Sequence, residues 1–222
     1  MPRHTFTGLT AMVGVTAAFV LAVRPWYLKW GATREECASA LPGDELMDSP
    51  DLVSTRAITV QAPPDVVWPW IAQLGQGRGG LYSYDFLENL VGCDIHSADE
   101  IVSEWQDVAV GDPFRLHPEM ALVVANVEPG RALVVSGEVP IDDAPMPFDF
   151  TWAFVLVADD DGATRLVVRE RYAYRESWAR LIVEPVELAS FVMSQKMLRG
   201  IRDRAESATG DTRRPSSPVS TA

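Results

Sequence analysis

A histidine among carboxylates is the first group in this sequence that could carry out acid–base chemistry. Asp94 lies two residues before His96, and Asp99 and Glu100 follow it. A general base and the acid that orients it must lie within hydrogen-bond reach of each other. Charged loops of an acidic protein bring the same residue types together without any such role. We therefore assign no catalytic residue, and His96 stays an open candidate.

Two tyrosines follow a glycine-rich loop, and their hydroxyls could form hydrogen bonds with a ligand. The run is Tyr82-Ser-Tyr-Asp85, which begins two residues after Gly80. One interpretation places it at the mouth of a cavity. The other treats it as the start of a helix, in which Ser83 or Asp85 caps the N-terminus and the tyrosines pack in the protein interior. The sequence leaves both open.

Several other classes of site are excluded. Gly75-Gln-Gly-Arg-Gly-Gly80 matches the dinucleotide fingerprint, but it follows a predicted helix, whereas phosphate binding needs a strand before the loop and a helix after it. Cys37 and Cys93 have neither a metal-binding spacing nor the number needed for a disulfide framework. We expect no cofactor and no metal.

The charge balance argues against nucleic acid. The chain has 19 Lys and Arg against 31 Asp and Glu, a net charge of −12. A nucleic-acid partner needs a basic surface that neutralises phosphates, and no stretch of the predicted domain supplies one.

The elements that must position these residues begin with a strand that runs directly into a helix. Ile58, Val60 and Ala62 alternate as on a half-buried strand. After Pro63-Pro64, apolar residues recur at helical spacing until Gly75, where glycine can end the helix. Folds that wrap a curved sheet around a ligand cavity begin in this way.

The rest of the domain is rich in strands and closes with a helix. Apolar runs at 120–127 and 131–139 flank Glu128-Pro-Gly130, and runs at 148–158 and 164–174 flank Asp159-Asp-Asp-Gly162, so each pair predicts a hairpin. A long amphipathic helix is predicted over 185–205, with Pro185 in its first turn. This order predicts an α+β domain.

An uncharged segment at 5–23 precedes this domain. Its length fits the roughly 20 residues of a transmembrane helix. Arg3 before it, and Trp26, Tyr27 and Lys29 after it, are typical of interfacial flanks. We expect an uncleaved anchor, with a cleaved signal peptide as the alternative. The basic residues after the segment favour a single-pass membrane protein with its domain on the cytoplasmic side.

The predicted organisation has five parts. These are an N-terminal flank (1–4), a transmembrane helix (5–23), a juxtamembrane connector (24–51), the main domain (52–208) and a disordered tail (209–222).

The sequence over 26–206 resembles the START-like, or SRPBCC, superfamily, which includes lipid-transfer domains and polyketide cyclases. The motifs that carry the resemblance are Trp30-Gly-Ala-Thr33, Leu41-Pro-Gly-Asp-Glu-Leu46, Ala62-Pro-Pro, Val67-Trp-Pro-Trp70, Gly79-Gly-Leu-Tyr-Ser-Tyr-Asp85, Leu87-Glu-Asn89 and Val110-Gly-Asp112. The resemblance implies a helix-grip fold, in which a curved antiparallel sheet wraps around a long C-terminal helix. It implies no set of catalytic residues.

In such a fold the cavity lies between the sheet and the helix, and strand alternation nominates its lining. Glu170 and Tyr172 share one strand face and would be the polar groups of the cavity, although an inward Glu170 needs a partner or a raised pKa. Large aromatic side chains could instead fill the space. The predicted ligand-binding residues are Tyr82, Tyr84, Phe150, Trp152, Phe154, Glu170, Tyr172 and Met193.

Three functional hypotheses follow. The first is a membrane-anchored domain that binds a hydrophobic small molecule or lipid without reacting with it. The second is an enzyme of the cyclase or dehydratase type that uses the same cavity. The third is an interaction module whose cavity has filled in. The oligomeric state is left open.

Overall fold

The predicted junction of strand and helix is confirmed. In the computed structural model, which describes residues 23–137 and 146–212, strand β1 (Leu52–Val60) is followed by helix α4 (Pro64–Ala72). Pro64 occupies the first turn, where a backbone N–H has no partner within the helix. The helix buries Val67, Trp70 and Ile71. Its apolar face therefore anchors it to the sheet.

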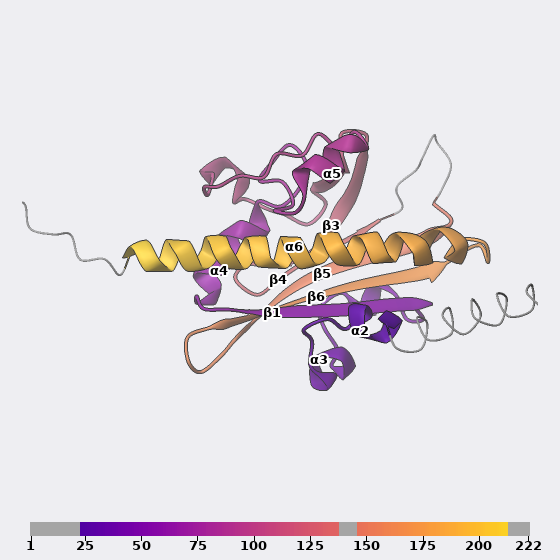
Figure 1. Ribbon diagram of the computed structural model, residues 1–222, viewed down its shortest axis with the longest axis horizontal. Coiled ribbons are helices and arrows are strands. Elements are labelled where there is room, and N and C mark those ends of the chain that lie inside the picture. Colours follow the sequence, from indigo (N-terminus) through magenta and orange to yellow (C-terminus); the bar gives the residue numbers. More distant parts are fainter. Residues whose placement is uncertain (1–22, 138–145, 213–222) are drawn as a thin grey trace, which may run out of the picture.

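Six antiparallel strands form one sheet in the order β1-β6-β5-β4-β3-β2 (Figure 1). The remaining strands are β2 (Pro113–His117), β3 (Met120–Glu128), β4 (Ala132–Gly137), β5 (Phe148–Ala158) and β6 (Thr164–Tyr174). The first and last strands in the sequence, β1 and β6, are neighbours, and β1 and β2 form the two edges of the sheet. Between β1 and β2 lie helix α5 (Asp85–Leu90) and the 3-10 helix η3 (Ser103–Trp105).

Both predicted hairpins are present. Gly130 (φ 76°) lies in the turn between β3 and β4, and Gly162 (φ 78°) in the turn between β5 and β6. A residue with a side chain is strained at such positive φ angles, which explains glycine at these turns. Residues 138–139 of the predicted strand at 131–139 lie outside the described residues. Strand β2 was not predicted.

Helix α6 (Arg180–Thr212) is longer than predicted and begins earlier. Its first turn lies around Ala179–Val183, where the N–H of Val183 donates to the carbonyl of Ala179 at 2.9 Å. Pro185 therefore lies inside the helix, whereas the sequence predicted it in the first turn. Ala179 and Val183, which precede Pro185, are buried, and their packing offsets the local cost of a proline inside the helix. The predicted domain ends at 208, whereas α6 continues to Thr212.

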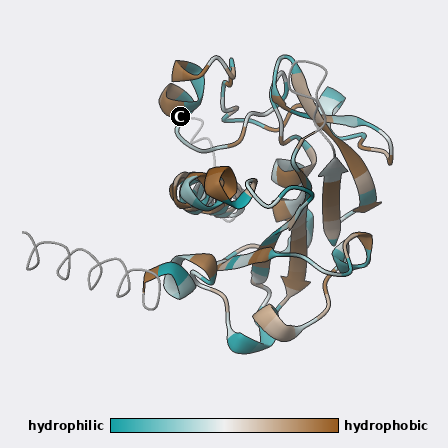
Figure 2. Cartoon of the chain, turned by 90° about the vertical axis from the view of Figure 1, so that its right-hand side faces the viewer, coloured by the Kyte–Doolittle hydropathy of each residue, from teal (hydrophilic) through white to brown (hydrophobic). Residues whose placement is uncertain are grey.

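The sheet and α6 together fit the predicted α+β, helix-grip arrangement, with α6 lying along one face of the sheet (Figure 1). Met197, Leu198 and Ile201 of α6 join Phe154 and Leu166 of the sheet in one buried core. Figure 2 looks nearly along α6 and shows hydrophobic strands beside it. Burial of this apolar surface is the main force that holds helix and sheet together.

The connector before β1 packs on the opposite face of the sheet, where alternation places Arg165 and Arg169 of β6. Arg165 pairs with Glu36 of α3 (Arg34–Ala38), at 2.6 Å between Nε and Oε1. Arg169 pairs with Asp44 of η2 (Asp44–Leu46) at 2.5 Å. These two ion pairs hold the connector against the sheet. Helix α2 (Arg24–Leu28) precedes both.

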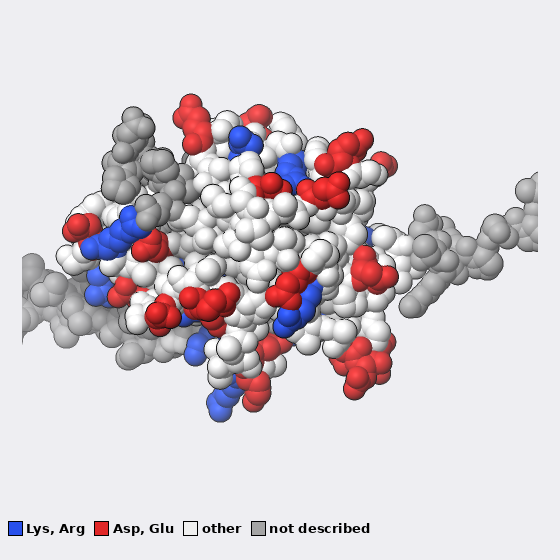
Figure 3. Space-filling model, turned by 180° about the vertical axis from the view of Figure 1, so that it is seen from behind, with Lys and Arg blue, Asp and Glu red and all other residues white. Residues whose placement is uncertain are grey.

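On the face seen from behind, acidic and basic side chains are scattered among uncharged ones (Figure 3).

The predicted single-pass membrane localisation requires a correction. Within 23–137 and 146–212, no helix combines the length and the apolar composition needed to cross a bilayer. Helix α2 has five residues, and the 33-residue α6 carries charged side chains along its length. This finding contradicts the predicted localisation. The predicted span itself, except for Val23, lies outside the described residues.

Candidate functional site

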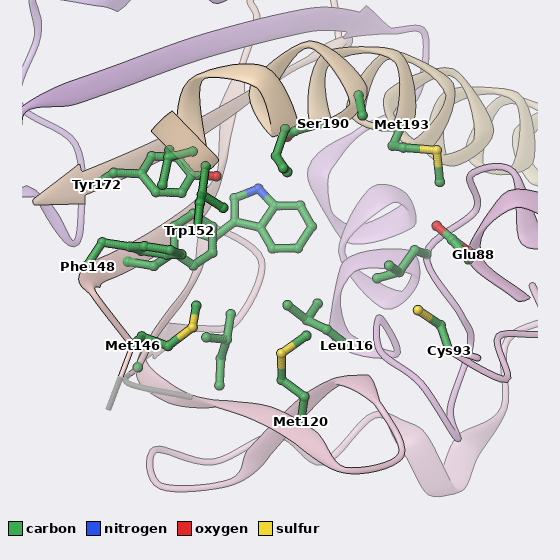
Figure 4. A pocket seen from close by; sticks show the side chains of 18 of the residues that line it. Glu88, Cys93, Leu116, Met120, Met146, Phe148, Trp152, Tyr172, Ser190 and Met193 are labelled. Carbon is green, nitrogen blue, oxygen red and sulfur yellow. The ribbon is translucent and has the colours of Figure 1, made fainter. Parts of the chain in front are cut away.

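A cavity of about 460 Å³ lies between the sheet, the first half of α6 and the segment that contains α5 (Figure 4). Its volume falls in the range of small-molecule sites. Its lining is almost entirely apolar and comes from segments far apart in the sequence. The lining residues are Leu81, Glu88, Cys93, Ile95, Leu116, Met120, Leu122, Gly137, Met146, Phe148, Phe150, Trp152, Tyr172, Ile182, Val183, Val186, Ala189, Ser190 and Met193.

Aromatic side chains of β5 and β6 form one wall of this cavity. The ring centroids of Phe150 and Tyr172 lie 4.7 Å apart, and those of Phe150 and Trp152 lie 6.4 Å apart. The two strands pair so that Phe150 is opposite Tyr172, which explains why the rings meet. Burial raises the pKa of Tyr172 well above its ordinary value, with Glu170 adding to the effect, so the phenol stays neutral.

The cavity is open to solvent beside α6. Ile182 and Val186 line it, yet 49% and 58% of their surfaces are exposed. Ala189, one turn further along the helix, also lines the cavity and is exposed. These three residues therefore mark the mouth through which a ligand can enter.

Glu88 of α5 is the carboxylate in the cavity wall (Figure 4). Only 7% of its surface is exposed, and its Oε2 atom has no hydrogen-bond partner among the described residues. Burial raises the pKa of Glu88 to about 7, and the neighbouring Asp85 adds to the rise. Burial and Glu88 also raise the pKa of the Cys93 thiol, which lies beside it and stays protonated at neutral pH.

The six-residue helix α5 is held in place by polar contacts with the chain that follows it. Asp85 accepts hydrogen bonds from the backbone N–H of Ser97 at 2.7 Å and from its hydroxyl at 2.6 Å. The side chain of Asn89 accepts from the N–H of Ile95 at 2.7 Å and donates to its carbonyl at 2.8 Å. A helix this short is marginal alone, so these contacts fix the direction of Glu88.

A second polar region lies beside the cavity, between β1, β6 and α6, and we name it the Arg56 cluster. The guanidinium of Arg56 contacts Glu170 Oε1 at 3.1 Å and Glu187 Oε1 at 3.4 Å. Glu170 also accepts hydrogen bonds from three serine hydroxyls at 3.1–3.2 Å. Burial raises the pKa of Glu187 to about 7, against the opposing effect of Arg56. The members are Ser54, Arg56, Glu170, Glu187, Ser190 and Ser194.

Half of the predicted ligand-binding residues line the cavity. These are Phe150, Trp152, Tyr172 and Met193. The indole N–H of Trp152, like Glu88 Oε2, has no hydrogen-bond partner within the described part of the chain. Both atoms are therefore free to form a hydrogen bond with a ligand.

The other four predicted residues lie outside the lining. Phe154 is fully buried deeper in the core, and Glu170 belongs to the Arg56 cluster. Tyr84 is 42% exposed at the start of α5. Tyr82 is buried, and its hydroxyl accepts a hydrogen bond from Gln73 at 2.9 Å.

Tyr82 has a structural explanation. Its backbone has a φ angle of 53°, which is strained for a residue with a side chain. Arg204 of α6 lies over its ring at 4.7 Å, and Ser97 accepts from its backbone N–H at 3.0 Å. Gly200 lets α6 pass against the Tyr82 backbone, since a Cβ there would lie 2.4 Å from the Tyr82 carbonyl oxygen. Tyr82 thus locks α6 to the loop after α4.

The remaining chemical candidate, His96, lies away from the cavity. Its ring contacts Asp94 at 3.2 Å, and 81% of the side chain is exposed. The described residues contain no group of three His, Cys, Asp or Glu side chains that could hold a metal ion. Sequence reasoning missed Glu88 as a site residue, although it noted the motif Leu87-Glu-Asn89 that contains it.

Among the comparisons with known proteins, only the comparison with solved structures finds similar proteins. No protein-family model matches the sequence, and no curated protein does. Norcoclaurine synthase from Thalictrum flavum, in complex with dopamine and hydroxybenzaldehyde, is 13% identical, with 74% of this chain and 89% of that chain covered and a TM-score of 0.43.

Two bacterial structures are similar to the same extent. A protein of Helicobacter pylori is 12% identical, with 76% of this chain and 96% of that chain covered and a TM-score of 0.46. A protein of Nitrosospira multiformis is 14% identical, with 72% and 99% covered and a TM-score of 0.44. Values this low transfer no function to this chain.

Proposed function

We propose that this chain is a START-like domain that binds a hydrophobic small molecule or lipid without reacting with it. The observation that carries the proposal is the cavity of about 460 Å³, with its apolar lining and its mouth beside α6. Folding normally fills space inside a core, because voids lose packing contacts. An apolar cavity that stays open at one side is suited to a ligand.

The energetics favour an apolar ligand. Burial of apolar surface stabilises a complex by ~25 cal/mol per Å². A ligand that buries roughly 200 Å² would gain about 5 kcal/mol, from which the costs of association are subtracted. The aromatic wall of Phe150, Trp152 and Tyr172 suits a flat ring or an extended chain.

An enzyme of the cyclase or dehydratase type is the second candidate, and Glu88 is the observation in its favour. A carboxyl with a pKa of about 7 could donate or accept a proton near neutral pH. Its titratable neighbours in the lining, Cys93 and Tyr172, both have raised pKa values and are held neutral. A single group of this kind suits a polar contact better than a paired acid and base, so we favour binding.

The test is a calorimetric titration of the full-length protein with two neutral probes, 2-(2-naphthyl)ethanol and decan-1-ol. Saturable binding of either supports the proposal, and the preferred probe separates a ring-shaped ligand from a lipid-like chain. The absence of saturable binding for both would contradict it. Native mass spectra of the purified protein, before and after denaturation, show whether a co-purified molecule already occupies the cavity and competes with the probes.

A further inference from the structure

We propose that the cavity selects ligands that carry a protonated amine, which pairs with Glu88 while the apolar part of the ligand lies against the aromatic wall. The assignment rests on the proposed binding function and names the chemical class of the ligand. It comes from the polar groups of the lining and their charges.

The first argument is the unmet hydrogen-bonding capacity of Glu88. This side chain is more than nine-tenths buried, lines the cavity, and has an oxygen without a partner among the described residues. A buried carboxylate costs free energy unless a donor or a cation meets it. Figure 4 shows Glu88 and Cys93 on one side of the cavity and the aromatic wall on the other. A bound donor at this position would supply the missing partner.

The second argument is the negative charge on the side of the cavity that contains Glu88. Asp85, on the same short helix, is a second carboxylate whose charge raises the pKa of Glu88. The residues that line the cavity within the described ranges include neither lysine nor arginine. The nearby arginine of the Arg56 cluster is already engaged by Glu170 and Glu187. A cation is therefore attracted to Glu88, and an anion is repelled.

The third argument is that α5 cannot easily turn Glu88 away. Asp85 and Asn89, on either side of Glu88, are both tied to the following loop. A carboxylate that was merely tolerated in the wall could rotate into solvent if its helix were free to move. The clamp holds Glu88 inward, which pre-organises the site and lowers the cost of binding.

The experiment uses three ligands that share a naphthalene ring: the cation 2-(2-naphthyl)ethylamine, the neutral 2-(2-naphthyl)ethanol and the anion of 2-naphthylacetic acid, called the acetate below. Each is titrated by calorimetry into the full-length protein and into two variants, Glu88→Gln and Glu104→Gln. The titrations are run at pH 8, above the pKa of about 7 for Glu88 and below that of an alkylammonium group, about 10. Glu104 is exposed in η3, so its variant matches the change in net charge without touching the lining.

We expect the wild-type protein to bind the amine at least about tenfold more tightly than the alcohol, and the acetate most weakly. Glu88→Gln should reduce the preference for the amine to about twofold or less, while the affinity for the alcohol is kept. Glu104→Gln should behave as the wild type does.

Two outcomes would overturn the amine assignment and leave the binding function intact. One is a wild-type protein that binds the alcohol or the acetate as tightly as the amine. The other is a Glu88→Gln variant that keeps the full preference for the amine. The comparison of the three ligands on the wild-type protein stands even if a variant fails to fold. If none of the three binds, the amine assignment fails; binding of decan-1-ol would then keep the proposed function, and its failure to bind would overturn that function too.

Discussion

Two buried polar regions meet at Ser190, and their carboxylates Glu170 and Glu88 are hydrogen-bonded to very different extents. In the Arg56 cluster, Glu170 receives a guanidinium and three hydroxyl groups. In the cavity, Glu88 has an oxygen that meets no donor within the described ranges. Ser190 belongs to both regions, since it lines the cavity and donates to Glu170 at 3.2 Å. Burial alone therefore does not distinguish them.

The difference teaches how to separate a structural carboxylate from a functional one. A buried ion pair whose partners come from the chain itself joins distant segments, here β1, β6 and α6. A carboxylate left without a partner lowers stability unless something outside the chain completes it. The Arg56 cluster thus stabilises the fold, whereas Glu88 has the features of a ligand-binding carboxylate.

The largest effect is expected from Arg56→Met, which leaves Glu170 and Glu187 buried without their shared cation. Removing one partner of a buried ion pair costs about 3–5 kcal/mol. We expect a loss of this size in the free energy of unfolding, measured by urea denaturation at pH 7. A loss below about 1 kcal/mol would show that the cluster does not hold the fold together.

The next effect concerns the pH dependence of stability. The pKa of Glu88 is about 7 in the folded state, above its ordinary 4.5, so the folded protein binds this proton more tightly. The free energy of unfolding should therefore fall by about 2–3 kcal/mol on account of Glu88 as the pH rises from about 4.5 to above 7. Glu88→Gln removes this contribution.

The measurement compares urea denaturation of the wild type and Glu88→Gln at pH 5 and pH 8. Glu187 also has a pKa raised to about 7, but it is present in both proteins and cancels from the difference. The variant should lose less stability between the two pH values than the wild type does. Identical losses would contradict the assignment of an unpaired carboxyl in the cavity.

A smaller effect tests whether the cavity is the region open to a ligand. Ala189→Trp places a large side chain at the mouth, where Ala189 is exposed and lines the cavity. We expect binding of 2-(2-naphthyl)ethanol to weaken about tenfold, with little change in stability. The matched control is Leu188→Trp, because Leu188 is exposed on α6 and lies outside the lining. Equal affinities for the two variants would place the ligand elsewhere.

The smallest effect is expected where an ion pair is exposed. Arg131 pairs with Glu128 beside the β3–β4 turn, and 64% of the arginine side chain is exposed. Arg131→Met should change the free energy of unfolding by less than about 0.5 kcal/mol, since solvent screens such pairs. This variant is the control for Arg56→Met. A comparable loss in both would mean that burial does not set the strength of these pairs.

Much of the candidate site could be predicted from strand alternation. Phe150, Trp152 and Tyr172 were placed on cavity-facing strand positions, and they line the cavity. The same rule also nominated Phe154 and Glu170, which face the same side of the sheet but contact the core and the Arg56 cluster. A period of two residues specifies the face of a sheet and not how far along the strand the cavity extends.

The short helix α5 could not be placed in this way. Six residues are too few for a periodic pattern, and α5 exposes Phe86 and Leu90 while it buries the charged Glu88. Its direction depends on Ser97 and Ile95, which follow it in a loop. Hydrophobicity alone would have buried the opposite face of this helix.

The sequence by itself determined the elements: the junction of strand and helix, the two hairpins and the long closing helix, because these depend on side chains a few residues apart. Only the tertiary structure decided which buried carboxylate receives a partner. Arg56 and Glu170 are 114 residues apart, and they meet because the first and last strands pair under α6. Glu88 instead lines the cavity with an oxygen that has no partner among the described residues, and no local pattern encodes that difference.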